Sequence, residues 1–309
     1  MKNKTNFMTK TWVIVVGAMI CCTLWGSAFP CIKIGYRMME IAAEDTASQI
    51  LYAGYRFTLA GVLTIVLGSI LQRKILLPKR SAIGKIGLLS LLQTVLQYLF
   101  FYIGLAHTTG VKASIIEAVS TFVAILVAGY LFHQETVTSR KMLGCLIGFA
   151  GVVLVNVAGS GMDFHFSPAG DGCILLSTVA YAFSSVCMKR FSQKEDPVML
   201  SGYQFILGGI VMIACGAAMG GHLKAFTASA AALLIYMAMI SAVAYSLWGM
   251  LLKYNPVSKV TVFGFMNPVI GVILSALLLN ETESLGVSSV LALGLVCVGI
   301  YIVNAKDKD

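Results

Sequence analysis

Apolar residues fill long windows of this sequence, and short polar segments separate them. The windows Thr11 to Ile32 and Ile86 to Ala106 contain no Asp, Glu, Lys or Arg. Because about 20 helical residues cross a hydrocarbon layer of roughly 30 Å, each window is long enough to span a membrane. The same pattern along the whole chain predicts ten spans. They cover residues 12–34, 49–71, 83–105, 113–132, 141–158, 170–190, 200–220, 228–252, 260–279 and 286–304.

Helices are expected for all ten spans. Backbone N–H and C=O groups in lipid must be satisfied, and a helix satisfies them within one segment. A membrane-spanning β-barrel would show short segments of alternating hydrophobicity, and these long apolar windows do not have that pattern. The sequence therefore predicts an all-α membrane protein with ten transmembrane helices.

Part of the pattern occurs twice. The stretch GYRFTLAGV begins at Gly54 and GYQFILGGI begins at Gly202, so five of nine letters agree at an offset of 148 residues. CTLWGSAFPCIK (22–33) aligns with STVAYAFSSVCMK (177–189) at an offset of 156. The second half therefore repeats the first half.

The repeat divides the chain into two five-helix units. Segment 104–135 aligns with 249–281, which extends the match to the fourth and ninth spans. The predicted domains are residues 1–158 and 159–309. Because five is odd, the second unit enters the membrane from the opposite side, which predicts inverted repeats with a site between the halves, as in secondary transporters.

Composition and charge agree with burial in lipid. Hydrophobic residues make up 58% of the 309 residues and charged residues 11%, whereas soluble domains carry about 25% charged residues. With the N-terminus in the cytoplasm, 17 of the 22 lysines and arginines fall in cytoplasmic segments, four fall outside, and Arg56 lies within a span. This positive-inside distribution predicts a multi-pass protein of the cytoplasmic membrane with both termini cytoplasmic. It accounts for the net charge of +9, so no nucleic-acid partner is expected.

Three stretches point to a family. WGSAFPCIK in the first span, AYSLWGMLLKYNPVSK after the eighth and NPVIGVILSALLLNE in the ninth resemble the EamA-type members of the drug/metabolite transporter superfamily. The resemblance covers nearly the whole chain. It implies a central cavity, surrounded by the first, third and fourth helices of each half, through which small metabolites such as amino acids move, commonly outward. In one departure, Thr121-Phe122 stands where the second half has Asn267-Pro268, so the first copy lacks a proline.

Energy coupling by ATP and catalysis would each leave a recognisable motif in the sequence. No GxxxxGK[ST] motif occurs, so ATP hydrolysis is not expected, and protons are a candidate coupling ion. The histidines lie at span ends or in loops, which argues against a metal site, a cofactor or an enzyme. They are His107, His133, His165 and His222.

Ionisable groups within membrane spans are costly and often functional, and two of the charged residues there are candidates. Arg56 is a candidate substrate-binding residue, and the alternative is that its long side chain reaches the membrane surface. Glu117 is a second candidate. Its alternative is structural, because Ser114 and Glu117 fit a capping box at the start of the fourth span.

Aromatic and amide side chains on the expected cavity helices complete the candidate site. The substrate-binding candidates besides Arg56 and Glu117 are Trp25, Gln93, Gln97, Tyr98, Tyr181, Tyr245, Trp248 and Asn267. An aromatic cavity with a few amides suits a small metabolite. The alternative for the aromatic residues is that they pack between helices or lie in the aromatic belt at the membrane interface. The expected function is export of small metabolites or amino acids by a secondary transporter using alternating access. The alternative is an uptake permease or facilitator for a small polar solute.

Overall fold

The computed structural model describes residues 7–108, 110–157, 166–224, 227–279 and 287–305. Within these ranges the chain is helical and contains no strands. Ten helical segments are long and apolar enough to cross a membrane, which confirms the ten predicted spans. The predicted boundary between the two units, at residue 158, lies outside the described residues.

Six spans are unbroken helices, and the other four contain π or 3-10 turns. The unbroken helices are α1 (Thr11–Met38), α2 (Thr46–Gln72), α7 (Ser139–Val157), α9 (Pro197–Ala218), α10 (Ala228–Tyr254) and α13 (Val287–Asn304). The third span is built from α3 (Arg80–Leu89), η2 (Ser90–Leu96) and α4 (Gln97–Leu105), and the fourth from α5 (Gly110–Ala118), α6 (Ser120–Leu126) and η3 (Val127–Leu131). The sixth consists of η4 (Pro168–Gly172) and α8 (Cys173–Ser192), and the ninth of α11 (Val257–Thr261), η5 (Val262–Phe265) and α12 (Met266–Leu279). A short 3-10 turn, η1 (Phe7–Thr9), precedes α1.

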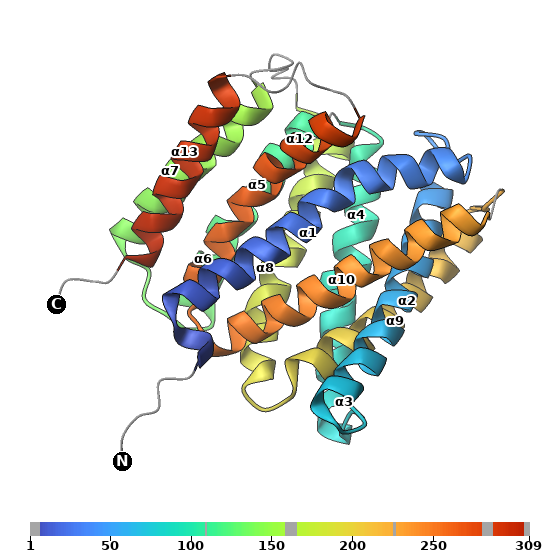
Figure 1. Cartoon of the computed structure of the whole chain (residues 1–309), viewed down its shortest axis with the longest axis horizontal. Helices are drawn as coiled ribbons and strands as arrows, with labels where there is room; N and C mark the ends of the chain where they lie inside the picture. The colour runs from blue at the N-terminus through green and yellow to red at the C-terminus, as the bar shows by residue number, and fades with distance from the viewer. Residues whose placement is uncertain (1–6, 109, 158–165, 225–226, 280–286, 306–309) are drawn as a thin grey trace.

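Helices α2 and α9 contain the two copies of the repeated sequence that begins at Gly54 and Gly202, and they pack directly against each other (Figure 1). A Cβ atom added at Gly54 would lie 3.0 Å from the Gly209 carbonyl oxygen, and one at Gly61 would lie 2.5 Å from that of Gly202. The two backbones therefore touch at their glycines, as small residues allow between membrane helices. Since Gly54 meets Gly209 and Gly61 meets Gly202, the two helices run antiparallel.

The last helices of the two halves, α7 and α13, form a second pair of this kind. A Cβ atom at Gly144 would lie 2.9 Å from the Gly299 carbonyl oxygen, and one at Gly151 would lie 2.7 Å from that of Ala292. This pair is also antiparallel. It lies at one edge of the bundle, with α2 and α9 at the opposite edge (Figure 1).

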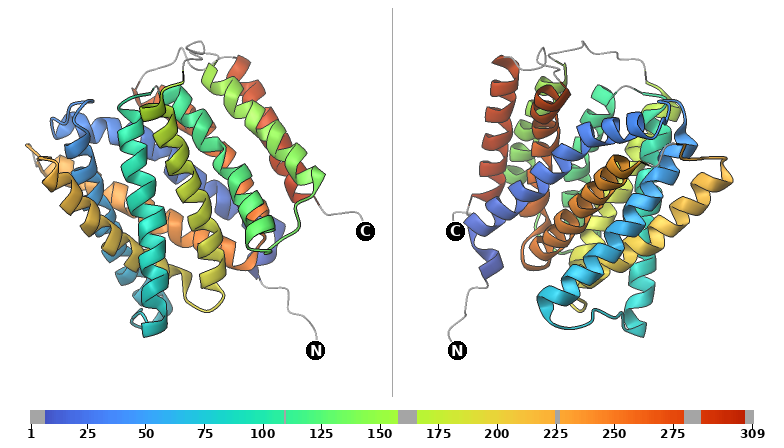
Figure 2. Two further views of the ribbon diagram at one scale, coloured as in Figure 1. Left: turned by 180° about the vertical axis from the view of Figure 1, so that it is seen from behind. Right: turned by 45° about the vertical axis from the view of Figure 1, so that its right-hand side comes forward.

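The remaining helices fill the centre of the bundle. Helix α1 packs against α10 and α12, while α8 packs against α4 and α6. Figure 2 shows these helices between the two edge pairs from two further directions. The first helix begins and the last helix ends at the same end of the bundle (Figures 1 and 2).

Candidate functional site

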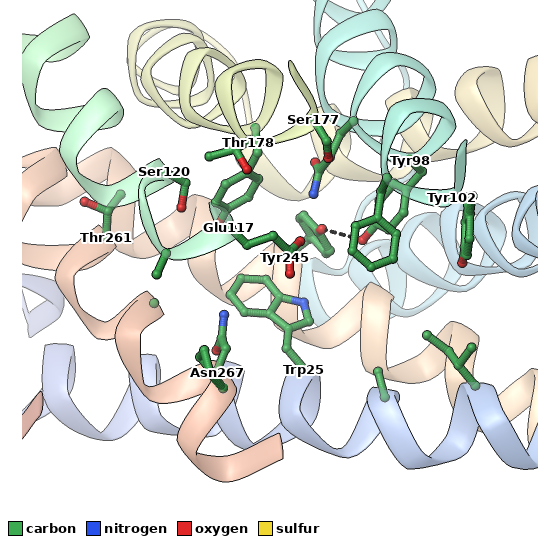
Figure 3. Close-up of a pocket in the computed structure, with 18 of the residues that line it drawn as sticks. Trp25, Tyr98, Tyr102, Glu117, Ser120, Ser177, Thr178, Tyr245, Thr261 and Asn267 are labelled. Atoms are coloured by element: carbon green, nitrogen blue, oxygen red, sulfur yellow. Dashed lines mark hydrogen bonds between the residues drawn. The ribbon is translucent and has the colours of Figure 1, made fainter. Parts of the chain in front are cut away.

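A cavity of about 140 Å³ lies among the central helices (Figure 3). Its lining comes from both halves of the chain: from α1, α2, α4, α5 and α6 in the first half, and from α8, α10, α11, η5 and α12 in the second. Eight of the ten candidates from the sequence line it. They are Trp25, Arg56, Gln97, Tyr98, Glu117, Tyr181, Tyr245 and Asn267.

The other two candidates, Gln93 and Trp248, do not line this cavity. Both are buried, with 2% of each residue exposed. The grouping of Gln93 with Gln97 assumed a regular α-helix, but Gln93 lies in the π-helical turn η2. The Trp248 ring packs edge-on against the Trp25 ring, with 5.0 Å between their centroids, and so lies behind the cavity wall.

Aromatic rings from both halves build the wall of the cavity. The Trp25 and Tyr245 ring centroids are 5.1 Å apart, and the Tyr98 and Tyr245 hydroxyls are hydrogen-bonded at 2.9 Å. Edge-to-face ring contacts of this kind stabilise a defined shape. The wall therefore offers a small solute flat apolar faces together with two hydroxyl groups.

Arg56 lies in the bundle interior and does not reach the membrane surface. Its residue is 3% exposed, and one guanidinium nitrogen donates to the Ser241 hydroxyl at 3.0 Å. The guanidinium also lies 5.0 Å from the centroid of the Phe57 ring. The surface-reaching alternative is wrong, because Arg56 is ten residues into α2, about 15 Å along the axis. The hydrogen bond to Ser241 places the Arg56 side chain on the face of α2 that packs against α10.

Glu117 points into the middle of the cavity (Figure 3). The capping-box alternative is wrong, because α5 already begins at Gly110 and Ser114 therefore lies within the helix. In the part of the chain that the structure describes, the Glu117 carboxylate makes no hydrogen bond, and no ion pair joins it to Arg56. The cavity therefore contains a guanidinium group and a carboxyl group that do not contact each other directly.

Several lining residues were not among the candidates. Hydroxyl groups come from Tyr102, Ser120, Ser177, Thr178 and Thr261, and apolar or small residues from Ala28, Ile32, Phe101, Ala118, Gly264 and Pro268. Helical spacing could have found some of these, since Ser120 follows Glu117 by three positions and Ser177 precedes Tyr181 by four. Their small polar side chains do not stand out in an apolar span, so they carried no signal alone.

Buried polar atoms in the wall have unused hydrogen-bonding capacity. The Trp25 indole nitrogen, the Gln97 amide oxygen and the Asn267 amide oxygen are buried without a hydrogen-bond partner. Buried polar groups are normally paired, so a ligand in the cavity would be the natural partner for these atoms. Among the described residues no group of three or more His, Cys, Asp or Glu side chains could hold a metal ion.

A polar network ties the cavity helices together at one end. The Glu135 carboxylate accepts from the Ser258 backbone N–H at 2.9 Å, from the Ser258 hydroxyl at 2.5 Å and from the Lys141 ammonium at 2.9 Å. Lys189 at the end of α8 donates to the carbonyl oxygens of Leu252 and Asn255 at the end of α10. At this end the segment between the fourth and fifth spans is therefore joined to the ninth span, and the sixth span is joined to the eighth.

A smaller network lies at the opposite end. Asp171 accepts from the Thr108 hydroxyl and from the Ser167 backbone N–H, the latter at 3.0 Å. The Lys112 ammonium lies 3.7 Å from the same carboxylate. These contacts join the ends of α4 and α5 to η4.

Comparison with known proteins gives a consistent result. The model of the EamA-like transporter family matches residues 12–157 and again residues 168–305. An uncharacterized transporter of Archaeoglobus fulgidus is 28% identical over 96% of this chain and 99% of its own length. The uncharacterized inner membrane transporter YedA of Escherichia coli K12 is 28% identical over 92% and 90% of the two chains. A solved crystal structure superposes with a TM-score of 0.77 at 16% identity, covering 94% of this chain and 96% of the other, which shows a shared fold.

Proposed function

The chain belongs to the EamA-like transporter family, and from that premise we propose that it is a secondary transporter that exports a small zwitterionic metabolite, such as an amino acid. The proposed site is the cavity among the central helices, and the proposed mechanism is alternating access. Protons are the proposed coupling ion. No catalytic step is part of the proposal.

The observation that carries the proposal is the presence of Arg56 and Glu117 in one cavity without an ion pair between them. Charges in a membrane interior are costly unless they are paired. A zwitterion would supply both partners, with its carboxylate toward the Arg56 guanidinium and its ammonium toward the Glu117 carboxylate. The Trp25 and Tyr245 rings would contact its apolar part.

Helix packing supports the inverted-repeat part of the proposal. The α2–α9 and α7–α13 pairs join corresponding helices of the two halves, and each pair is antiparallel. Antiparallel counterparts are expected when the two halves cross the membrane in opposite directions. The one-sided distribution of Lys and Arg places both chain ends in the cytoplasm under this proposal.

Transport by purified protein in proteoliposomes tests the proposal. A panel of zwitterionic, anionic and cationic metabolites is offered, with and without a pH gradient. We expect zwitterions to move and the gradient to change their rate. Arg56→Gln and Glu117→Gln are expected to abolish the preference for zwitterions, whereas Arg80→Gln and Glu44→Gln, which change exposed side chains, are expected to leave it intact. Movement of only singly charged or neutral compounds would contradict the zwitterion assignment.

A further inference from the structure

The positive charge of Arg56 has no negative partner within the protein. In the part of the chain that the structure describes, no ion pair includes Arg56. Its guanidinium donates to the Ser241 hydroxyl, which is neutral, and lies 5.0 Å from the centroid of the Phe57 ring. Hydroxyls and aromatic rings lessen the cost of a buried cation, but they do not cancel its charge. The substrate-free protein therefore has an uncompensated cation within a membrane-spanning helix.

Three tyrosines lie around this guanidinium. Tyr52 precedes Arg56 by four residues in α2, so the two side chains share a face of the helix, and that of Arg56 points back toward Tyr52. The Tyr36 ring of α1 packs edge-on against the Tyr52 ring, with centroids 5.8 Å apart. Tyr102 of α4 lines the cavity together with Arg56. All three tyrosines interact electrostatically with Arg56, and we call the four residues the Arg56 cluster.

The Arg56 cluster contains donors that have no acceptor. The Tyr36 hydroxyl, the Tyr52 hydroxyl and the Nε atom of Arg56 are buried and make no hydrogen bond. Tyr52 is 1% exposed and Arg56 is 3% exposed. Each of these three atoms carries a hydrogen that it can donate, and Nε can do nothing else. Buried donors are normally paired, so three of them beside a cation indicate a place for an acceptor with negative charge.

The cavity gives a small ligand access to the Arg56 cluster. Arg56 and Tyr102 line the cavity beside Ala28 and Ile32 of α1. Tyr102 lies at one edge of the labelled side chains, away from Thr261 (Figure 3). Beyond this edge the helices are close together, because a Cβ atom added at Gly35 would lie 2.7 Å from the Tyr52 hydroxyl oxygen. The cluster therefore forms a narrow end of the cavity.

Charge and space together indicate the class of ligand. One guanidinium supplies one positive charge, which a singly charged anion balances. A doubly charged anion such as sulfate would leave a net negative charge in the membrane interior, where an unpaired charge is costly. The narrow space beside Gly35 favours a compact ion over an extended one.

We infer that the Arg56 cluster binds a small singly charged inorganic anion of the size of chloride when no substrate is present. The Arg56 guanidinium and the Tyr36 and Tyr52 hydroxyls donate to this anion. The inference concerns the substrate-free protein and does not depend on the proposed transport function. The proposed function places the substrate carboxylate at the same guanidinium, so the anion and the substrate are expected to exclude each other.

Binding of radiolabelled chloride to purified protein in detergent tests this site without any substrate. We expect saturable binding that unlabelled chloride and bromide displace and that sulfate displaces poorly. In thermal unfolding, chloride replaces gluconate at constant ionic strength. The melting temperature is expected to rise by about 3 °C at ten times the half-saturating chloride concentration. Absence of saturable chloride binding, or displacement by sulfate as readily as by chloride, would overturn the inference.

Variants of the Arg56 cluster locate the bound anion. Arg56→Gln is expected to abolish both chloride binding and the chloride-dependent rise in melting temperature. Tyr36→Phe and Tyr52→Phe keep the rings and remove one donor each, so the half-saturating chloride concentration is expected to rise about tenfold in each. Tyr55→Phe is the matched control, because Tyr55 belongs to the same helix and is 43% exposed.

The outcomes separate a local site from a general salt effect. Unchanged chloride binding in Arg56→Gln would overturn the inference, as would equal weakening by Tyr52→Phe and Tyr55→Phe. The two conservative tyrosine variants decide the question if Arg56→Gln does not fold. Because no substrate is present and no transport is measured, failure of the zwitterion assignment leaves this result unaffected.

Discussion

The repeated sequence has different roles in the edge pair α2–α9 and in the central cavity. At the edge, the residues that match between the halves make the contacts: Gly54, Gly61 and Phe57 meet Gly209, Gly202 and Phe205. In the cavity, some of the lining residues differ between the halves: Arg56 and Glu117 line it, and the corresponding residues of the other half are Gln204 and Phe263. Matched positions build the frame, and positions that differ give the cavity its charged groups.

The largest expected effect comes from breaking the frame. A Cβ atom at Gly61 would lie 2.5 Å from the Gly202 carbonyl oxygen and 2.6 Å from the Ile206 backbone nitrogen, so backbone must move to admit it. Gly61→Val is expected to destabilise the folded protein by about 3 kcal/mol or more. Thermal unfolding in detergent measures this. Gly294→Val is the matched control, because a Cβ at Gly294 meets nothing within 4 Å. An equal loss of stability in both variants would mean that the low helix propensity of valine, rather than the α2–α9 contact, is responsible.

Removing the cavity charges should instead separate function from folding. Arg56→Gln installs the residue that the second half already accommodates beside Thr94, so Ser241 can still bond it and the fold is expected to persist. Transport is expected to fall by about 10- to 100-fold, as when one partner of a buried charge pair is lost. Initial rates are measured at equal folded yield, with Glu117→Gln beside it.

The double variant Arg56→Gln/Glu117→Gln sharpens this result. If the two residues bind a zwitterion, the double variant stays slow, because the substrate has lost both partners. If the two residues instead form a gate by pairing in another conformation, the transport rate of the double variant recovers, because neither charge is left unpaired. Wild-type rates in both single variants would end either explanation.

A smaller effect, on substrate affinity at one face of the membrane only, is expected from Gln204→Arg. Thr94 stands opposite position 204 as Ser241 stands opposite Arg56, so an arginine there has a ready acceptor. A charged donor binds a carboxylate more strongly than an amide does, which is expected to lower the half-saturating substrate concentration by about tenfold at the membrane face nearer residue 204. The half-saturating concentration at the opposite face is expected to stay unchanged. Measurement from each face in oriented vesicles checks both values, and an equal change at both faces would contradict a local effect of residue 204.

Most of the fold follows from sequence, for a simple physical reason. Lipid excludes charge and unpaired backbone groups, so ten charge-poor windows leave ten helices as the stable outcome. The repeated glycines also indicate which helices correspond. The windows do not reveal the π-helical turns η2, η3 and η4, because hydropathy does not distinguish a π-helical turn from an α-helical one.

The site was less predictable than the fold. Trp25, Tyr98 and Tyr245 were found because large polar aromatics are conspicuous on cavity helices. The two structural alternatives failed for a common reason: whether Arg56 reaches the surface and whether Ser114 caps a helix both depend on where a helix starts. Hydropathy fixes helix starts only to within a few residues. Ser177 and Thr261 were missed because hydroxyls are common inside helices, and only the assembled bundle shows which of them face the cavity.

The smallest effect concerns a charge asymmetry at the end of the third membrane span. The Lys85 ammonium lies 2.6 Å from the Glu195 carboxylate, joining α3 to the loop between α8 and α9, and the repeat positions Ala232 and Met39 are uncharged. The hydrogen bond from Lys85 holds the pKa of Glu195 below its ordinary value of 4.5. A carboxyl whose pKa is lower in the folded state adds stability above its unfolded pKa, and that stability is lost as the pH falls through the folded pKa. Glu195→Gln is therefore expected to lower the melting temperature by about 1–2 °C at neutral pH, and the difference from the wild type is expected to shrink as the pH falls below the unfolded value and through the lowered folded pKa. Thermal unfolding from neutral into acid pH measures the difference, with the exposed Glu44→Gln as control. A difference that does not shrink in acid would show that Glu195 acts through packing, and the contrast between the two halves would then rest on the cavity charges alone.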